Sequence, residues 1–236
     1  GLDTVAVRMP SDPIAAALIR AAGGFVSAPS ANTSGKPSPT RAEHVINDLS
    51  GRIDMIIQDD TVDIGVESTI IDLSEEVPTI LRPGYITQAM FEEAIGKTII
   101  DPAIMGSLKE GVIPKAPGMK YKHYAPNADV TIVEGPHEKV VQYINRQVSE
   151  KEAEGHRCAV MATDETKDKY ICNDIVSAGH KDDELSVARN LYAILRDFDK
   201  QKVEYVYSES FETKNVGQAV MNRLIKAAGH KIVKLD

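Results

Sequence analysis

The sequence predicts an α/β protein with two domains, and three observations support this. Residues 129–236 alternate strand-like and helix-like segments, which is typical of a mostly parallel, Rossmann-like sheet. Residues 1–97 combine β-branched runs, typical of consecutive strands, with short amphipathic helices. Residues 98–128 hold four prolines and scattered glycines without a regular pattern. We therefore expect two domains, 1–97 and 129–236, joined by a Pro-rich linker at 98–128.

Capping residues and β-branched runs place the elements of the first domain. Asp12 caps a helix that starts at Pro13, and Thr40 and Glu43 form a capping box for the next helix. The expected helices lie at 13–22, 41–49 and 87–95. The expected strands lie at 4–9, 53–59, 65–73 and 78–84.

The second domain is regular throughout. The expected strands lie at 129–135, 157–163, 203–208 and 231–235. The expected helices lie at 137–153, 184–198 and 216–229. No G-x-G-x-x-G motif follows the first of these strands, which disfavours dinucleotide binding there.

Charge and composition exclude several classes of protein. The net charge is −8, distributed as −5 over residues 1–128 and −3 over the remainder, so neither half is a basic nucleic-acid module. Cys158 and Cys172 form no CxxC pair, so we expect two reduced thiols and no zinc site. There is no apolar run of about 18 residues and no signal peptide. We expect a cytoplasmic protein without a membrane segment.

The stretch "SAPSANTSGKPSPT", residues 27–40, is rich in hydroxyl groups. Its three prolines stiffen the backbone, which argues against a flexible spacer. Two interpretations remain open on composition alone. The hydroxyls could satisfy the backbone of a capped turn. Alternatively, the loop and the helix after it could bind an anion, because a helix N-terminus carries positive potential.

Further polar residues lie at strand ends. Glu67, Ser68 and Thr69 interrupt an apolar run, and Arg8 and Arg82 each end an expected strand. A guanidinium there can grip a phosphate or carboxylate bidentately, although a lone surface arginine is also common. We find no Ser/His/Asp triad, no cysteine nucleophile with a base and no metal-ligand set. The inventory favours binding of anionic groups over covalent catalysis, and no catalytic residue is assigned.

Four motifs occur in a fixed order: "LDTVAVRMP", "APSANTSGKPSPT", "GVESTIIDL" and "ILRPG". Together they resemble the Sua5/YrdC/YwlC family, the L-threonylcarbamoyladenylate synthases. The later "APGMKYKHYAP" and the α/β domain after it resemble the two-domain Sua5/YwlC branch. The resemblance implies that residues 1–97 are the C-terminal part of a YrdC-like catalytic domain, a partial twisted α/β sheet around a concave cavity. It implies that residues 129–236 are a Sua5-type C-terminal domain.

The resemblance also implies a reaction and its participants. L-threonine, bicarbonate and ATP, with Mg²⁺, would give threonylcarbamoyl-AMP and diphosphate. The product would pass to the transferase machinery that makes t6A in tRNA, with at most a weak tRNA contact. The residues that would bind ATP are Thr4, Ser30, Asn32, Ser38, Arg82 and Tyr124. The residues that would bind L-threonine are Arg8, Ala28 and Ser68.

The chain departs from the family pattern at its start. Family members carry an N-terminal Thr-containing loop and a Lys-x-Arg motif, which residues 1–10 do not supply. We therefore expect this chain by itself to be inactive. Two other hypotheses stay open: an RNA-binding module of YrdC type without catalysis, and a regulatory role for residues 129–236.

Overall fold

The structure is a computed structural model that describes residues 4–59, 62–104 and 125–236. The chain divides into two compact units, residues 1–30 and residues 31–236. No helix in the described ranges is both long enough and apolar enough to cross a membrane.

The described part of the first unit, residues 4–30, contains one helix, α1 (Pro13–Ala21), as the sequence predicts. Asp12 caps it by accepting a hydrogen bond from the backbone N–H of Ala15 at 2.6 Å. The strand expected at 4–9 is wrong, since these residues form no strand. A strand exists only where its backbone bonds to a neighbour, and no described residue pairs with this segment. Val5 and Val7 are accordingly 85% and 88% exposed.

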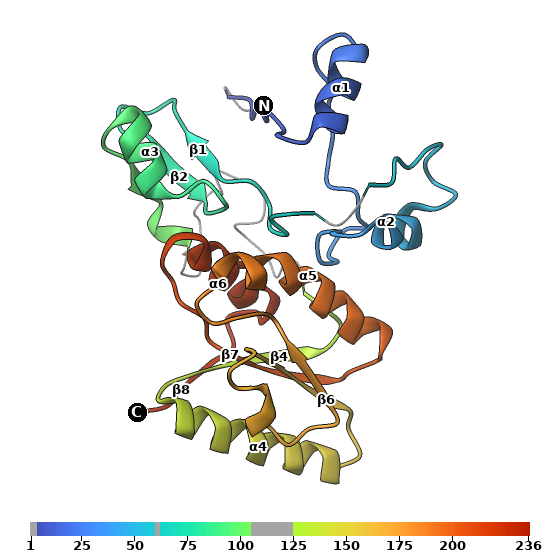
Figure 1. Cartoon of the computed structure of the whole chain (residues 1–236), viewed down its shortest axis with the longest axis vertical. Helices are drawn as coiled ribbons and strands as arrows, with labels where there is room; N and C mark the ends of the chain where they lie inside the picture. The colour runs from blue at the N-terminus through green and yellow to red at the C-terminus, as the bar shows by residue number, and fades with distance from the viewer. Residues whose placement is uncertain (1–3, 60–61, 105–124) are drawn as a thin grey trace. The chain divides into compact units, whose positions relative to one another are not determined.

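The second unit begins with a helix and a small mixed sheet. Strand β2 pairs antiparallel with β1 and parallel with β3, and α3 connects β2 to β3 (Figure 1). The helix expected at 87–95 is confirmed as α3, and Thr87 is its N-cap, accepting a hydrogen bond from the backbone N–H of Met90. The elements are α2 (Ala42–Leu49), β1 (Ile70–Asp72), β2 (Thr79–Arg82), α3 (Gln88–Ile95), β3 (Ile99–Ile100) and the short 3₁₀ helix η1 (Pro102–Ile104).

Several expectations for this region are wrong. Residues 53–59 form no strand, and 65–69 form a loop ahead of β1. The capping box is also wrong, because α2 is preceded by Arg41, which makes no side-chain cap. The backbone N–H of Thr40 instead donates to Nδ1 of His44 at 3.1 Å. This contact ties the loop before α2 to the helix in place of the expected cap.

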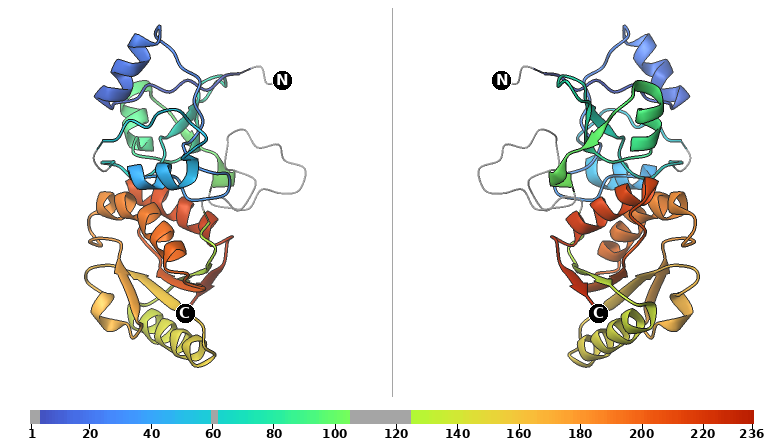
Figure 2. Two further views of the ribbon diagram at one scale, coloured as in Figure 1. Left: turned by 90° about the vertical axis from the view of Figure 1, so that its right-hand side faces the viewer. Right: turned by 90° about the vertical axis from the view of Figure 1, so that its left-hand side faces the viewer.

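The remainder of the second unit is a parallel five-stranded sheet in the order β6-β5-β7-β4-β8. Helix α4 covers one face, and α5 and α6 cover the other (Figures 1 and 2). This confirms the Rossmann-like prediction. The sequence missed β6, a four-residue strand at the edge of the sheet. The elements are β4 (Asp129–Glu134), α4 (His137–Ala153), β5 (Cys158–Ala162), the 3₁₀ helix η2 (Lys167–Lys169), β6 (Asp174–Ser177), α5 (Glu184–Lys200), β7 (Tyr205–Glu209), α6 (Asn215–Ala227) and β8 (Ile232–Lys234).

Strand β5 shows how the sheet builds two cores. Ala159 and Met161 belong to the core beneath α5 and α6, whereas Cys158, Val160 and Ala162 belong to the core against α4. Successive side chains of a strand point to opposite faces, so one apolar run fills both cores. The sheet is therefore buried on both faces, and α5 and α6 are fixed on it as a rigid pair.

The domain boundaries stay a prediction. Strand β3 lies within the range expected to be a linker, yet it pairs with β2 of the first sheet. Residues 105–124, which make up most of that range, lie outside the described residues.

Candidate functional site

Two predicted motifs of the second unit meet at the end of strand β2. Arg82 donates from Nε and Nη2 to the carbonyl oxygen of Ser68, at 3.1 and 2.9 Å. A Cβ atom at Gly84 would lie 2.4 Å from the backbone nitrogen of Thr69 and 2.7 Å from the carbonyl oxygen of Glu67. Only glycine permits this approach. The "RPG" and "GVEST" segments are therefore locked together.

Glu67 is the centre of a buried polar cluster. Ser38 donates its hydroxyl proton to Oε1 of Glu67, and the Tyr192 hydroxyl lies 3.0 and 2.9 Å from the two carboxylate oxygens. Nε of Arg223 donates to Oε2 at 2.9 Å. The side chain of Arg223 is fully buried, and that of Glu67 is 13% exposed. We call Ser38, Glu67, Tyr192 and Arg223 the Glu67 cluster.

The charges of this cluster favour an ionised carboxylate. Burial alone would raise the pKa of the Glu67 carboxyl. The positive charge of Arg223, with hydrogen bonds from Ser38 and Arg223 and the charge of Arg82, outweighs burial and holds that pKa below its ordinary value. Glu67 therefore acts as an acceptor for all of its partners at neutral pH.

A second buried carboxylate anchors the loop that precedes Ser38. Asp48 of α2 accepts from the backbone N–H of Thr33 at 3.2 Å, from Nζ of Lys36 at 3.0 Å and from Nη2 of Arg196 at 2.9 Å. Arg196 also donates to the carbonyl oxygen of Pro37. Burial would raise the pKa of Asp48, but the hydrogen bonds from Arg196 and Lys36 lower it far below its usual value. The loop is held at several points and is not a spacer.

Asn32 stabilises the turn inside this loop. Its Nδ2 donates to the carbonyl oxygens of Thr33 and Lys36 at 2.9 and 3.3 Å. This contact matches the capped-turn interpretation for Asn32. Its Oδ1 is buried and has no hydrogen-bond partner among the described residues. Ser38 differs from Asn32, because its hydroxyl bonds to Glu67 and not to the local backbone.

The predicted site residues fall into three groups. Four lie in the second unit: Ser38, Ser68 and Arg82, which are connected through Glu67, and Asn32, which bonds within its own turn. Four others lie in the first unit and are exposed: Thr4, Arg8, Ala28 and Ser30. Their positions relative to Ser38 and Arg82 stay a prediction, and Tyr124 lies outside the described residues.

Sequence reasoning missed the residues of α5 and α6 that hold these loops. Tyr192 lies on the apolar face of α5, so the sequence marks it as a core residue and does not indicate a polar partner for its hydroxyl. Arg223 is four residues after Ala219 and four before Ala227, and both alanines are buried. An arginine on the buried stripe of a helix requires a buried partner, and this was the available indication.

Lys226 lies one helical turn after Arg223 and is only 9% exposed. Its side chain makes no hydrogen bond or ion pair with any residue in the described ranges. Burial, with the nearby charges of Arg223 and Arg82, lowers the pKa of Lys226 to about 8, against the opposing effect of Glu67. The folded protein therefore carries an unfavourable charge at neutral pH.

This charge predicts a rise in stability with pH. Between pH 8 and 10.5 the unfolded chain holds a proton on Lys226 that the folded chain has lost, so the free energy of unfolding increases across that window. The variant Lys226→Met should be more stable than the wild type at pH 7, by on the order of 3 kcal/mol. Urea unfolding at pH 7 and pH 10 measures both effects. An equal pH dependence in wild type and variant would contradict the prediction.

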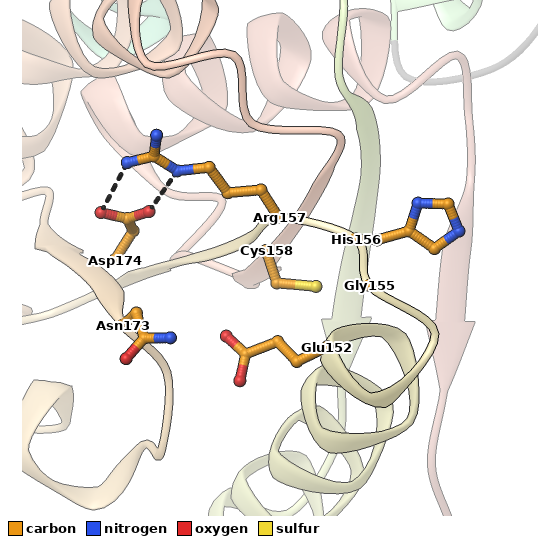
Figure 3. A pocket seen from close by; sticks show the side chains of 7 residues that line it. All are labelled: Glu152, Gly155, His156, Arg157, Cys158, Asn173 and Asp174. Carbon is orange, nitrogen blue, oxygen red and sulfur yellow. Dashed lines mark hydrogen bonds and ion pairs between the residues drawn. The ribbon is translucent and has the colours of Figure 1, made fainter.

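Two other groups of polar residues lie near the two ends of strand β5. Figure 3 shows a pocket of about 430 Å³ beside the start of β5, lined by Glu152, Gly155, His156, Arg157, Cys158, Asn173 and Asp174. Arg157 and Asp174 form a bidentate pair there, at 2.8 and 3.3 Å. The thiols of Cys158 and Cys172 are free, and burial raises the pKa of each to about 11, which makes them poor nucleophiles.

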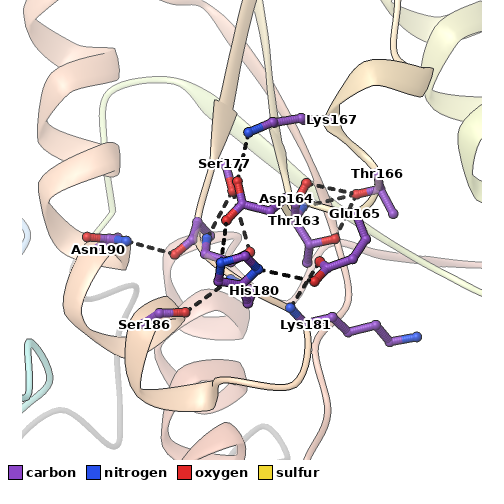
Figure 4. A network of polar contacts seen from close by, with 12 residues as sticks. Thr163, Asp164, Glu165, Thr166, Lys167, Ser177, His180, Lys181, Ser186 and Asn190 are labelled. Atoms are coloured by element: carbon purple, nitrogen blue, oxygen red, sulfur yellow. Dashed lines mark hydrogen bonds and ion pairs between the residues drawn. The ribbon is translucent and has the colours of Figure 1, made fainter.

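A second cluster follows the end of β5. Glu165 accepts from the backbone N–H of Lys181 at 3.0 Å and lies 3.4 Å from Nδ1 of His180 (Figure 4). Asn190 of α5 donates to the carbonyl oxygen of Ala178 at 3.0 Å in the same region. These bonds connect the two loops at this edge of the sheet to each other and to α5.

The fold and the site define a two-domain α/β protein in which Ser38 and the strand-end Arg82 both bond to the "GVEST" segment. The described ranges contain no group of three His, Cys, Asp or Glu side chains that could hold a metal ion. A family model described as "Threonylcarbamoyl-AMP synthase, C-terminal domain" matches residues 86–229. A model described as "Telomere recombination", of the Sua5/YciO/YrdC type, matches residues 1–84.

Curated relatives extend over the whole chain. The chain is 44% identical to threonylcarbamoyl-AMP synthase of Bacillus subtilis, covering 99% of this chain and 66% of that protein. It is 45% identical to the synthase of Pyrococcus abyssi, covering 100% and 67%. A crystal structure of P. abyssi Sua5 complexed with L-threonine matches with a TM-score of 0.90 at 44% identity, covering 100% of this chain and 67% of that one. The chain thus spans about two thirds of the length of these relatives.

The chain belongs to the threonylcarbamoyl-AMP synthase family, in its two-domain Sua5 form. This confirms the family that the four motifs predict. The comparisons do not favour the alternative of an RNA-binding module without catalysis.

Proposed function

We propose that the protein is an L-threonylcarbamoyladenylate synthase, which forms threonylcarbamoyl-AMP and diphosphate from L-threonine, bicarbonate and ATP. The identity of 44–45% to synthases along the whole chain carries this proposal. The structure adds that the "GVEST" and "RPG" motifs lie together with Ser38 in the second unit.

We assign the nucleotide to the residues that the family motifs mark. Thr4, Ser30, Asn32, Ser38 and Arg82 would bind ATP, as would Tyr124. Arg82 would suit a polyphosphate, because a guanidinium supplies several hydrogen-bond donors. Ser38 gives its one hydroxyl proton to Glu67, so it would offer the nucleotide an acceptor, for a ribose hydroxyl or the adenine amino group. Arg82 is only 8% exposed, and a buried guanidinium interacts more strongly with an anion than an exposed one does.

L-threonine would be bound by Arg8, Ala28 and Ser68. Arg8 would pair with the carboxylate, and Ala28 would contribute its backbone. The P. abyssi structure with L-threonine bound supports threonine as the amino acid. These three assignments rest on the motifs.

This chemistry needs positioning and charge stabilisation and no protein nucleophile. Mg²⁺ would accompany ATP, held in part by the phosphate oxygens and in part by water. The product would pass to the t6A transferase machinery in the cytoplasm, and any contact with tRNA would be weak given the net charge of −8.

Diphosphate release tests the proposed function. We expect the full-length protein, supplied with ATP, Mg²⁺, bicarbonate and L-threonine, to release diphosphate and to incorporate labelled bicarbonate into a nucleotide product. Omitting threonine should reduce both signals to background, since threonine supplies the amine that is carboxylated. Diphosphate release that continues unchanged without threonine would contradict the proposal.

A further inference from the structure

The hydroxyl group of Ser38, a predicted ATP-binding residue, is hydrogen-bonded to the carboxylate of Glu67. A serine hydroxyl has one proton, and Ser38 donates it to Glu67. Glu67 therefore fixes the rotamer of Ser38 and determines which lone pairs of its oxygen face a ligand. The next residue, Ser68, accepts from Arg82, so Glu67 lies beside both proposed ATP-binding side chains.

A carboxylate in this place would oppose a nucleotide. ATP carries several negative charges, and an uncompensated Glu67 would repel them through a medium of low dielectric constant. The compensating charge comes from the C-terminal domain, since Arg223 of α6 donates to Oε2 of Glu67 at 2.9 Å and is itself fully buried. The Tyr192 hydroxyl of α5 lies within 3.0 Å of both oxygens and fixes the plane of the carboxylate.

Arg223 also orders the backbone of both motif loops. Its Nη1 donates to the carbonyl oxygen of Pro83 at 2.7 Å, and its Nη2 to that of Glu67 at 3.3 Å. One guanidinium therefore fixes the "GVEST" loop, the "RPG" loop and the carboxylate between them. The five N–H donors of arginine make this possible, whereas lysine would lack the fork.

We infer that Arg223 and Tyr192 are positioning residues of the nucleotide subsite. Arg223 neutralises Glu67 and Tyr192 orients its carboxylate, so that Ser38 and Arg82 can bind ATP. The inference rests on the proposed function. It gives the C-terminal domain a specific part in the reaction: it raises the affinity for ATP through two side chains that do not touch the nucleotide.

Neutralising each member of the pair in turn gives the sharpest test. Arg223→Gln leaves Glu67 unneutralised, so ATP affinity at pH 8 should fall by about tenfold or more, while affinity for uncharged adenosine changes by less than about twofold. Adding Glu67→Gln removes the repelling charge, so the double variant should recover most of the ATP affinity. Isothermal titration of the full-length protein with each ligand measures this. Additive losses in the double variant would overturn the inference.

Tyr192→Phe provides a milder variant that preserves charge and packing. We expect its dissociation constant for ATP to rise by about threefold to tenfold, with little change for L-threonine. In a Ser38→Ala background the same substitution should have almost no further effect on ATP, because Tyr192 acts through Ser38. An effect that persists undiminished in that background would contradict the inference, as would an unchanged ATP affinity in Tyr192→Phe itself.

Asp197→Asn is the matched control. Asp197 of α5 pairs with Arg41 at 3.4 Å on the surface. This pair also connects α5 to the segment that follows Ser38, but it makes no contact with Ser38 itself. We expect it to leave ATP affinity unchanged. The wild type separates the two levels of failure: no ATP binding by the wild type contradicts the proposed function, whereas normal binding by wild type and Tyr192→Phe alike contradicts this inference alone.

Discussion

Replacing Arg196 by methionine is expected to lower the free energy of unfolding by about 3–5 kcal/mol. Arg196 is 9% exposed and its partner Asp48 only 1% exposed, so the variant leaves a buried carboxylate without its principal counter-charge. The carbonyl oxygen of Pro37 loses its donor at the same time. Urea unfolding followed by circular dichroism at pH 7 measures the loss.

Arg157→Met is the control, because it removes a pair of similar geometry at the surface. Arg157 reaches both oxygens of Asp174, but the two side chains are 50% and 23% exposed. Exposed pairs contribute about 0–1 kcal/mol, since water solvates both partners after the substitution. Equal losses in the two variants would show that burial of Asp48 does not determine the cost.

The second large effect is expected for Gly65→Ala. A Cβ atom at Gly65 would lie 2.3 Å from Cα of Arg189 and 2.4 Å from the carbonyl oxygen of Ala188, both in the backbone of α5. Backbone atoms of a helix cannot move aside cheaply, so the "GVEST" loop would have to lift away from α5. We expect a loss of about 3 kcal/mol or more, measured as a shift of the urea midpoint.

Gly51→Ala isolates the steric part of this loss. Gly51 has φ of +74°, almost equal to the +76° of Gly65, but a Cβ atom there would meet nothing within 4 Å. The backbone penalty should therefore be similar in both variants, at about 1 kcal/mol. If Gly51→Ala cost as much as Gly65→Ala, the close approach to α5 would not be the cause.

Both expected losses of stability come from contacts between the motif loops and the helices α5 and α6. The loops that carry the family motifs contain little helix or strand, and α5 and α6 supply the groups that hold them. Because these helices are packed on a five-stranded sheet buried on both faces, they form a stiff support. A binding loop held in this way loses little conformational entropy when a ligand binds.

Helices with a strong hydrophobic periodicity could be predicted from the sequence. Elements that depend on hydrogen bonds to distant residues could not. Helices α4, α5 and α6 carry long apolar stripes, so their residues determine both their type and their approximate bounds. Residues 4–9 have the composition of a strand, but a strand also needs a hydrogen-bonding neighbour, which composition does not supply. The capping box failed for a similar reason, since His44 competes for the backbone of Thr40.

The sequence by itself determined the fold class, the family and the motifs "GVEST" and "RPG", because each of these depends on residue types at fixed spacing. Only the tertiary structure decided what Glu67 does. Its partners Ser38, Tyr192 and Arg223 lie 29, 125 and 156 residues away along the chain, so no local pattern relates them. A buried carboxylate is tolerated only where donors from other elements converge on it, and that convergence arises when the helices pack.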